Sequence, residues 1–238
     1  MREKIVGIAG GMGPESTTDL MQKIFAATRA EREQDHIHLI VDSNPKTPDR
    51  MEFILGEGES PVPVISEGIR RLAAAGADLI LIPCNTAHAF FDELQAATSV
   101  PIVNMIELCA GWIRDHYTEG DRLGILATTG TVRSGIYETA LRRRGLEVIV
   151  PSDTEQQELM EAIFGPRGIK MGCLAANAPR VVDLATKLID RGAQAVVAGC
   201  TEVGLVLTGC DFTVIDPVRL LAEEAVRLVK GPDGVVQP

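Results

Sequence analysis

The 238-residue sequence has few aromatic residues, an excess of acidic over basic residues and no long apolar run. Aromatic residues make up 4% of the chain, which argues against a surface that stacks nucleic-acid bases. Lys and Arg number 23 against 33 Asp and Glu, a net charge of −10 with His neutral. This balance argues against a general nucleic-acid or anionic-membrane binder, because both need a basic face. No segment approaches the roughly 18 consecutive apolar residues of a transmembrane helix.

Metal-ligand motifs and targeting segments are also missing from the sequence. Its cysteines include no Cys-x-x-Cys pair and its histidines no His-x-x-x-His pair, so we predict no metal site. The N-terminal apolar run that begins at Ile5 ends within a few residues, which is too short for the core of a secretion signal. We therefore expect a cytoplasmic protein with reduced thiols and with no nucleic-acid or membrane partner.

A glycine-rich turn follows the first apolar run, but it does not match the known nucleotide-binding patterns. Residues 10–16 read Gly-Gly-Met-Gly-Pro-Glu-Ser, which differs from the Gly-x-Gly-x-x-Gly pattern of dinucleotide-binding turns. The phosphate-binding pattern Gly-x-x-x-x-Gly-Lys-Ser/Thr is also absent. The sequence therefore predicts no such cofactor. It predicts a backbone turn that lets a small ligand approach, and Met12 in this turn is a candidate binding residue.

Apolar residues, 45% of the chain, form short runs separated by segments of helix length. Near-continuous apolar strands that alternate with helices are typical of parallel sheets covered on both faces, so we predict an α/β fold. The expected strands are Lys4–Ala9, Ile37–Asp42, Asp78–Pro83, Pro101–Asn104, Arg122–Ala127, Glu147–Val150, Gln194–Ala198 and Phe212–Ile215. The expected helices include Glu15–Glu33, Val62–Ala75, Ala87–Thr98 and Arg180–Arg191.

The second half of the chain repeats the pattern of the first. The glycine-containing segments 5–13 and 122–130 are similar and lie 117 residues apart. Cys84 and Cys200 follow two other similar apolar segments and lie 116 residues apart, and a third matching pair follows in the same order. Matches at a nearly constant offset indicate two homologous halves, each with its own parallel sheet. The alternative is that α/β units simply resemble one another.

Cys84 and Cys200 each lie where a predicted strand gives way to a helix. Ligand sites in open α/β sheets lie at the carboxyl ends of the strands, so two halves that face each other would direct both thiols into one cleft. A helix N-terminus lowers the pKa of a neighbouring thiol, which favours a reactive pair. The alternative, a small buried apolar residue, is favoured for Cys109, Cys173 and Cys210, which have no counterpart in the other half.

Further candidate residues lie on loops that follow the predicted strands. Arg50 comes after a loop stiffened by two prolines, and Arg167 and Lys170 lie on a second loop rich in glycine. Loops held by a rigid sheet commonly carry binding residues. We therefore interpret these cations as candidate ligands of an anion, with a solvated surface residue as the alternative for Arg50.

Hydroxyl groups and one histidine complete the set of candidates. The turn at residues 127–131, Ala-Thr-Thr-Gly-Thr, offers Thr129 and Thr131 as hydrogen-bond donors to a small carboxylate. His88 lies four residues after Cys84, one helical turn away, where it would be able to tune the thiol. The alternative for His88 is a residue of the core or of the helix surface.

Six short motifs, spread over essentially the whole chain, contain these candidates. They are Gly-Gly-Met-Gly-Pro-Glu (10–15), Ser-Asn-Pro-x-x-Pro-Asp-Arg (43–50), Pro-Cys-Asn-Thr-Ala-His (83–88), Ala-Thr-Thr-Gly-Thr (127–131), Ala-Gly-Cys-Thr-Glu (198–202) and Ile-Asp-Pro (215–217). Together they resemble the cofactor-independent aspartate/glutamate racemase family. The resemblance implies two pseudo-symmetric flavodoxin-like domains, an active site in the cleft between them and a homodimer. It also implies that the last strand and helix of each half cross over, so that residues 1–99 with 210–238 form the first domain and residues 100–209 the second.

The resemblance also implies a chemistry for the site. It implies racemisation of aspartate without pyridoxal phosphate, with Cys84 and Cys200 as two bases on opposite sides of the substrate. The positions that hold the α-carboxylate and amino group match Asn85, Thr86, Thr129 and Thr201. The positions that hold the distal carboxylate match Arg50 and Lys170, with Arg167 as an alternative to Lys170.

Two bases suit a racemase, because the α-proton must leave one face of the carbon while another proton arrives at the opposite face. Three other functions stay open. One is a racemase for glutamate or for acidic amino acids in general, the second is a non-catalytic binding protein for an acidic metabolite, and the third is a thiol redox sensor. Because the acidic chain repels an acidic substrate, any such site needs local cations to offset the protein's own field.

Overall fold

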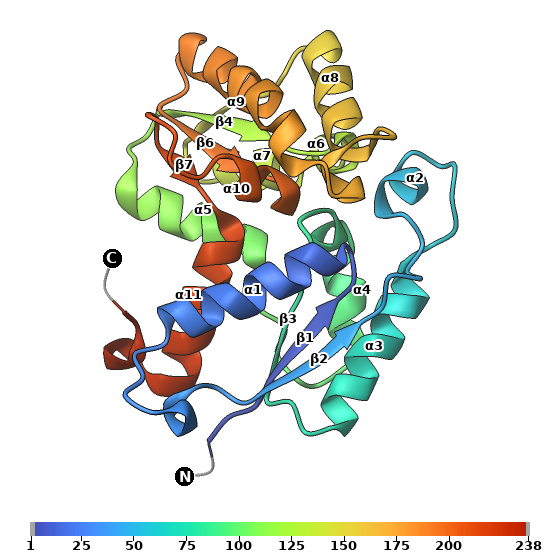
Figure 1. Ribbon diagram of the computed structural model, residues 1–238, viewed down its shortest axis with the longest axis vertical. Helices are drawn as coiled ribbons and strands as arrows, with labels where there is room; N and C mark the ends of the chain where they lie inside the picture. The colour runs from blue at the N-terminus through green and yellow to red at the C-terminus, as the bar shows by residue number, and fades with distance from the viewer. Residues whose placement is uncertain (1–2, 237–238) are drawn as a thin grey trace. The chain divides into compact units, whose positions relative to one another are not determined.

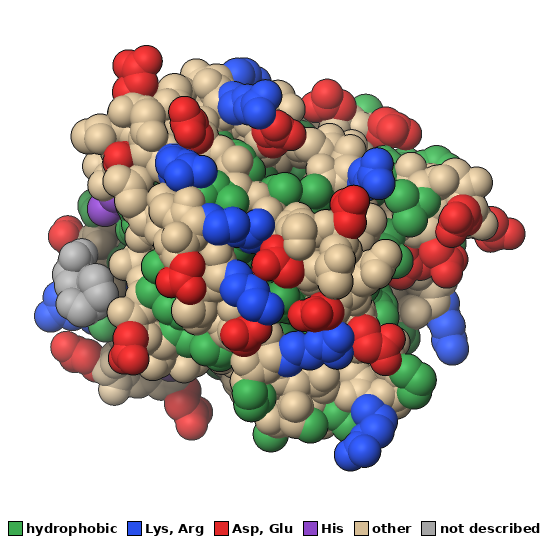
Figure 2. Space-filling model, turned by 90° about the horizontal axis from the view of Figure 1, so that it is seen from above, with side chains coloured by type: hydrophobic (Ala, Val, Ile, Leu, Met, Phe, Trp, Pro, Cys, Tyr) green, Lys and Arg blue, Asp and Glu red, His purple; other side chains and the backbone are tan. Residues whose placement is uncertain are grey.

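The computed structural model describes residues 3–236, which form two α/β units (Figure 1). Within the described range, the first unit comprises residues 3–105 and 218–236. The second unit comprises residues 106–217. Within the described residues, no helix combines the length and apolarity needed to cross a membrane. On the face shown in Figure 2, Lys and Arg side chains are interspersed with Asp and Glu and do not gather into a patch of one sign.

The first unit contains a parallel sheet with the strand order β2-β1-β3. Its strands are β1 (Val6–Gly10), β2 (Leu39–Ser43) and β3 (Leu79–Leu81). Its helices are α1 (Pro14–Ala27), α2 (Arg50–Ile54), α3 (Val62–Ala74), α4 (Phe91–Ala96) and α11 (Pro217–Lys230), with 3-10 turns at Glu33–Asp35, Thr86–Phe90 and Pro232–Gly234. All residues of β1 are buried, so this strand is covered on both faces as its apolar sequence predicts.

The second unit contains a parallel sheet with the strand order β5-β4-β6-β7. Its strands are β4 (Arg122–Leu126), β5 (Glu147–Ile149), β6 (Ala195–Ala198) and β7 (Val214–Ile215). Its helices are α5 (Met105–His116), α6 (Thr129–Ser134), α7 (Ile136–Arg142), α8 (Asp153–Phe164), α9 (Leu174–Asp190) and α10 (Thr201–Val206), with a 3-10 turn at Ile169–Met171.

The two sheets share one strand order, as the internal repeat predicts. β1 lies between β2 and β3 in the same way that β4 lies between β5 and β6. Ile102 forms a parallel bridge with Ile80 of β3, in the place that β7 holds beside β6. This order is that of flavodoxin-like sheets. The predicted α/β fold with two parallel sheets is therefore confirmed.

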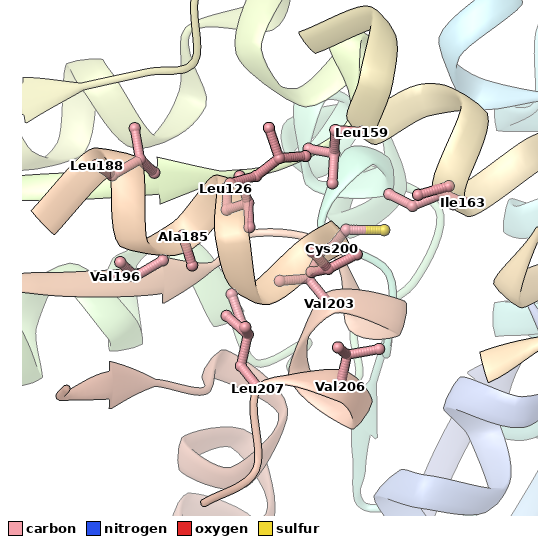
Figure 3. Packing of buried hydrophobic residues seen from close by; sticks show 14 of the residues in the cluster. Leu126, Leu159, Ile163, Ala185, Leu188, Val196, Cys200, Val203, Val206 and Leu207 are labelled. Carbon is pink, nitrogen blue, oxygen red and sulfur yellow. The ribbon is translucent and has the colours of Figure 1, made fainter. Parts of the chain in front are cut away.

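Each candidate cysteine belongs to the apolar core of its own unit. In the first unit, Cys84 is part of a buried cluster that includes Ile69 of α3 and Ile80 of β3. In the second unit, Cys200 is part of a cluster that includes Val196 of β6 and Val203 of α10 (Figure 3). Because interiors of this kind are closely packed, the core holds the position of each thiol.

The predicted domain boundaries differ from the observed units at both junctions. The sequence predicts residues 210–217 in the first domain, whereas β7 pairs with β6 in the second sheet. It predicts residues 100–105 in the second domain, whereas Ile102 pairs with Ile80 in the first sheet. A strand stays with its sheet because its backbone N–H and C=O groups need partners there. The chain changes unit at the helix that follows each of these strands. From its second residue on, α5 belongs to the second unit, and α11 likewise belongs to the first unit.

Some predicted elements also end elsewhere than expected. The helix predicted over Glu15–Glu33 ends at Ala27, because Thr28 has an extended backbone and its hydroxyl donates to the carbonyl of Ile24 at 2.7 Å. The predicted helix Ala87–Thr98 begins as a 3-10 turn before α4. The predicted strand Pro101–Asn104 is reduced to the single bridge at Ile102.

Candidate functional site

Cys84 lies just beyond β3, at the carboxyl end of the first sheet. It is 5% exposed, and its backbone N–H donates to the carbonyl of Ile82 at 2.8 Å. The next two residues, Asn85 and Thr86, are buried as well and lead into the 3-10 turn. One short buried segment thus carries a thiol, a carboxamide and a hydroxyl.

His88 holds the backbone of this segment. Its Nδ1 lies 2.9 Å from the carbonyl oxygen of Cys84, and its Nε2 accepts from the backbone N–H of Met105 at 3.2 Å. Because a carbonyl only accepts, Nδ1 carries the hydrogen. Burial lowers the pKa of His88, which keeps the ring neutral at neutral pH. The side chain expected to tune the thiol therefore binds the backbone of Cys84, and the alternative of a core histidine describes it better.

Arg50 connects the turn after β1 with the loop after β2. Its guanidinium donates to the carbonyls of Pro48 at 3.1 Å and of Thr47 and Met12 at 3.5 Å. Its Nε is buried and has no hydrogen-bond partner in the part of the chain that the structure describes. The structure thus brings two predicted binding residues, Met12 and Arg50, together. It also leaves one buried N–H of the guanidinium that an anionic ligand would satisfy.

Gly11 makes this close approach possible. Its φ of +88° lies in the left-handed region, and a Cβ at this position would lie 2.4 Å from the backbone of Asn44. A side chain here would push apart the turn after β1 and the loop after β2. The glycine-rich turn therefore serves close packing of two loops at the carboxyl end of the sheet.

A buried charge pair lies beside Cys200. The Sγ of Cys200 donates to Oε2 of Glu202 at 2.9 Å, and Nζ of Lys170 lies 2.9 Å from the other carboxylate oxygen. The hydroxyl of Thr201 also donates to Oε2 at 2.9 Å. Lys170 additionally lies over the ring of Phe164, 5.1 Å from its centroid. The Glu202 carboxylate thus contacts a thiol, a hydroxyl and an ammonium group, and we call these four side chains the Glu202 group.

Burial and the charges in this group together determine the protonation of Cys200. Burial raises the pKa of the Cys200 thiol well above its ordinary value, and Glu202 raises it further, while Lys170 partly opposes both. Burial by itself would raise the pKa of Glu202, but Lys170 and the hydrogen bond from Cys200 lower it below its ordinary value. At neutral pH the group therefore contains a carboxylate and a protonated thiol. The expectation of a lowered thiol pKa at this helix start is wrong for Cys200.

The second cation of the same loop lies apart from this group. Arg167 is exposed, and its carbonyl accepts from the side-chain amide of Asn177 at 2.8 Å. Lys170 is the residue whose ammonium lies next to Glu202. Of the two alternatives, the structure therefore favours Lys170 as the cation near Cys200.

The hydroxyl-rich turn after β4 divides into two roles. Thr128 caps α6: its Oγ1 accepts from the backbone N–H of Thr131 at 3.4 Å and lies 3.1 Å from the Thr131 hydroxyl. Thr131 is 1% exposed. Thr129 is half-buried, and its Oγ1 accepts from Nε2 of Gln156 at 3.2 Å. Thr131 thus contributes to the helix cap, whereas Thr129 is the more accessible of the two predicted ligands.

The remaining cysteines lie in ordinary packing positions. Cys109 on α5 is fully buried, and burial raises its pKa. Cys173 and Cys210 are partly buried. All five cysteines are free thiols. Across residues 3–236, no group of three His, Cys, Asp or Glu side chains is arranged to hold a metal ion.

The structure adds two residues that the sequence reasoning did not single out, Glu202 and Gln156. Glu202 lies two residues after Cys200, so an acidic residue this close to a candidate thiol was a usable signal. Gln156 lies on α8 and reaches the turn after β4 only through the tertiary fold.

Comparison with known proteins identifies the relatives of the chain. Residues 9–225 match the family model of the Asp/Glu/hydantoin racemases. The broad-specificity amino-acid racemase RacX of Bacillus subtilis is 28% identical over 230 residues, 93% of this chain and 96% of the relative. The solved aspartate racemase of Picrophilus torridus is 30% identical with a TM-score of 0.86, covering 95% of this chain and 94% of that one. An aspartate racemase homologue from Pyrococcus horikoshii is 28% identical with a TM-score of 0.74, covering 96% and 100%.

The duplicated α/β fold and these matches define the class of protein. The chain belongs to the Asp/Glu/hydantoin racemase family, as the six motifs indicate. Family membership and the aspartate racemase neighbour make it an isomerase of the amino-acid racemase class, so the predicted enzyme class is confirmed.

Proposed function

We propose that this amino-acid racemase interconverts L- and D-aspartate without pyridoxal phosphate, with Cys84 and Cys200 as its two bases. The matched position of the thiols carries the proposal: Cys84 follows β3, the neighbour of β1, and Cys200 follows β6, the neighbour of β4. Both therefore lie at the carboxyl ends of equivalent strands, where α/β sheets bind ligands. The similarity to the aspartate racemase of Picrophilus torridus supports aspartate as the substrate.

The surroundings of Cys200 support an assignment of the resting protons. A carboxylate can only accept a hydrogen bond, so the short contact of Glu202 with Cys200 favours a protonated thiol. One thiolate and one thiol are needed at the start of each turnover. We therefore assign the thiolate to Cys84 and the thiol to Cys200 in the form that begins catalysis.

Turnover then consists of two proton transfers. The Cys84 thiolate takes the α-proton, so an S–H bond forms while the C–H bond breaks and its electron pair spreads into the α-carboxylate. The Cys200 thiol gives its proton to the opposite face, which leaves a thiolate beside the Glu202 carboxylate. These like charges raise the basicity of Cys200, which suits it to remove the proton from the other enantiomer. Each sulfur must approach to about 3–3.5 Å from the reacting carbon, so the two sulfurs would be about 6–7 Å apart.

Neutral and charged donors around the thiols would hold the substrate. We assign Asn85, Thr86, Thr129 and Thr201 to the α-carboxylate and the amino group. Hydrogen bonds that strengthen as charge develops on the carboxylate contribute about 3 kcal/mol each in comparable sites. We assign the distal carboxylate to Arg50 and to Lys170. Because Lys170 already pairs with Glu202, Arg50 is the main ligand in this proposal.

A second candidate function is racemisation of several acidic amino acids, including glutamate. This function is favoured by the similarity to RacX, a broad-specificity racemase, which extends over 93% of this chain. A broad-specificity racemase would use the same two bases. Its site would differ from an aspartate-specific site in the space available to the side chain that carries the distal carboxylate.

The proposed chemistry and the family resemblance also favour a cellular compartment and an oligomeric state. Both bases must stay reduced, which a reducing compartment such as the cytoplasm ensures, and all five thiols are free. As the family resemblance implies, we expect a homodimer, which sedimentation would detect.

Exchange of the α-proton tests the function directly. The purified protein, without added cofactor, is incubated in heavy water with each enantiomer of aspartate and of glutamate. We expect deuterium at the α-carbon and loss of optical activity, faster with aspartate. Equal rates with both amino acids would favour the broad-specificity function. Binding of aspartate without any exchange would contradict racemisation and favour a binding protein, and a Cys84–Cys200 disulfide without activity would favour a redox sensor.

Replacing Arg50 tests the assignment of the distal carboxylate. We expect Arg50→Ala to raise KM for aspartate by about 10- to 100-fold, because hydrogen bonds between charged groups contribute about 1.5–3 kcal/mol. The increase should be smaller for alanine, which has no distal carboxylate. Arg70→Ala is the matched control, since Arg70 is exposed and pairs with Glu67 on the helix surface. A wild-type KM for aspartate in Arg50→Ala would show that another residue holds that carboxylate.

A further inference from the structure

Gln156 carries a buried hydrogen-bond acceptor that no other described residue of the chain uses. Its Nε2 donates to the carbonyl of Ala127 at 3.0 Å and to Oγ1 of Thr129 at 3.2 Å. Its Oε1 is shielded from solvent and has no hydrogen-bond partner among residues 3–236. A buried acceptor without a partner is costly, so an unused oxygen in an otherwise well-bonded carboxamide points to a ligand with an N–H group.

The orientation of this carboxamide is fixed by its neighbours. A carbonyl oxygen can only accept, so the Gln156 atom next to the Ala127 carbonyl must be the nitrogen. Turning the amide over would place two acceptors against each other. The unpartnered atom is therefore the oxygen.

The same carboxamide orients the hydroxyl group of Thr129 so that this hydroxyl can donate a hydrogen bond to a ligand. Because Oγ1 of Thr129 accepts from Gln156, its hydroxyl hydrogen points elsewhere and is available to a ligand. The backbone N–H of Thr129 donates to the thioether sulfur of Met160 at 3.4 Å, and thioether sulfur is a weak acceptor. Two donors of Thr129 thus lie beside one unused acceptor of Gln156.

These groups lie beside Cys200 within the second unit. β4 and β6 are neighbours, and Leu126 pairs with Ala198. Ala127 and Gly199, which follow these two residues, are in contact, since a Cβ on Gly199 would lie 2.7 Å from Cβ of Ala127. Gln156 binds the carbonyl of Ala127, and Cys200 follows Gly199 directly. The acceptor and the donors therefore belong to the same strand ends as the thiol.

We propose that Gln156 is a specificity-determining residue that recognises the α-ammonium group of the substrate through Oε1 while its Nε2 orients the Thr129 hydroxyl toward the α-carboxylate. An ammonium group has only donors and a carboxylate only acceptors, which matches this pair of residues. Gln156 thereby selects 2-amino acids over dicarboxylates that lack the amino group. This inference rests on the proposed function, since it names the substrate class of the same site.

Binding of aspartate and succinate to wild-type and variant protein tests the inference. The two ligands share the two carboxylates and differ in the amino group. By calorimetry we expect the wild type to bind aspartate at least about tenfold more tightly than succinate, because a site that hydrogen-bonds a polar group rejects the analogue without it. In Gln156→Met this preference should fall about tenfold, while succinate affinity changes little. Gln157→Met is the matched control, since Gln157 is an exposed neighbour on α8.

The outcomes separate this inference from the proposed function. A wild type that does not prefer aspartate, or a Gln156→Met protein that keeps the full preference, overturns the role of Gln156 even when the wild type exchanges the α-proton. Loss of the preference supports the role even when no α-proton exchange occurs, and in that case racemisation alone is contradicted. Measuring the wild-type preference needs no substitution, so the test stands even if Gln156→Met does not fold. Gln156→Leu then replaces it as the variant.

Discussion

Cys84→Ala and Cys200→Ala should each abolish racemisation of aspartate, with kcat reduced about a thousandfold or more. General acid–base groups typically contribute 10²–10⁴-fold, and here one missing thiol leaves one face of the α-carbon without a proton donor or acceptor. The measurement is the change in optical rotation or a chiral separation of the product. A single variant with near-normal turnover would contradict the two-base mechanism.

Proton exchange adds a sharper signature to the same variants. Each variant keeps one base, so it can still remove and return the α-proton on one face without inverting the carbon. In heavy water we expect Cys84→Ala to exchange the proton of one enantiomer slowly and Cys200→Ala that of the other. A merely structural role of either cysteine would not produce opposite enantiomer preferences.

The other cysteines provide matched controls. Cys173→Ala should keep normal activity, since Cys173 is partly exposed and its Sγ makes a long, weak contact of 4.0 Å with the carbonyl of Met171. Cys109→Ala removes a fully buried side chain and should lower stability while leaving the chemistry intact. Loss of racemisation in Cys173→Ala would show that racemisation requires Cys173 in addition to Cys84 and Cys200.

The cysteine pair could be selected from the sequence because its signal is local. Each thiol follows an apolar strand directly, and the strand and its thiol recur 116 residues later. The same repeat predicted two parallel sheets, which the structure confirms, and their shared strand order agrees with two related halves. The domain boundaries did not follow, because the sequence does not show whether a strand or only its following helix changes unit. That choice depends on the backbone ladder of β7 with β6.

The electrostatics of the site could not be predicted, because they depend on residues distant in the chain. A helix start beside Cys200 suggests a lowered thiol pKa, but α10 has only six residues and the thiol is buried beside a carboxylate. Burial and Glu202 therefore outweigh the helix terminus. Lys170 and Gln156 reach the strand ends from separate loops and helices, so no short motif contains both them and Cys200.

Glu202→Gln should move the alkaline limb of the kcat/KM profile to lower pH. Burial raises the pKa of Cys200 most, the Glu202 carboxylate raises it further and Lys170 lowers it, so removing the carboxylate charge lowers that pKa. Enzyme in which both thiols are deprotonated has no proton to deliver and is inactive. A nearby charge shifts a pKa by about 1–3 units, so we expect the limb to move by about one pH unit. Both enantiomers should show the same shift, because racemisation has an equilibrium constant of one.

The same substitution should destabilise the fold. Glu202 is buried and its partner Lys170 is only partly exposed, so the variant leaves an ammonium group without its carboxylate. Breaking a fully buried pair costs about 3–5 kcal/mol of unfolding free energy, and we expect a value at or below the lower end at neutral pH because Lys170 is partly exposed. The pKa of Glu202 is lowered by folding, so this stabilisation is present above the ordinary carboxyl pKa of about 4.3 and is lost as pH falls below it. Denaturant unfolding at several pH values measures both effects.

Two further variants distinguish the electrostatic role of Glu202 from its packing. Glu138→Gln is the surface control, because the pair of Glu138 with Arg142 is exposed and contributes only about 0.3–0.5 kcal/mol. In a double-mutant cycle with Lys170→Met, the double variant should lose less stability than the two single variants combined, since no unpaired charge remains. Glu202→Asp keeps the carboxylate and should restore part of the alkaline limb. If Glu202→Gln leaves that limb unchanged while lowering stability, Glu202 supports the fold and does not set the basicity of Cys200.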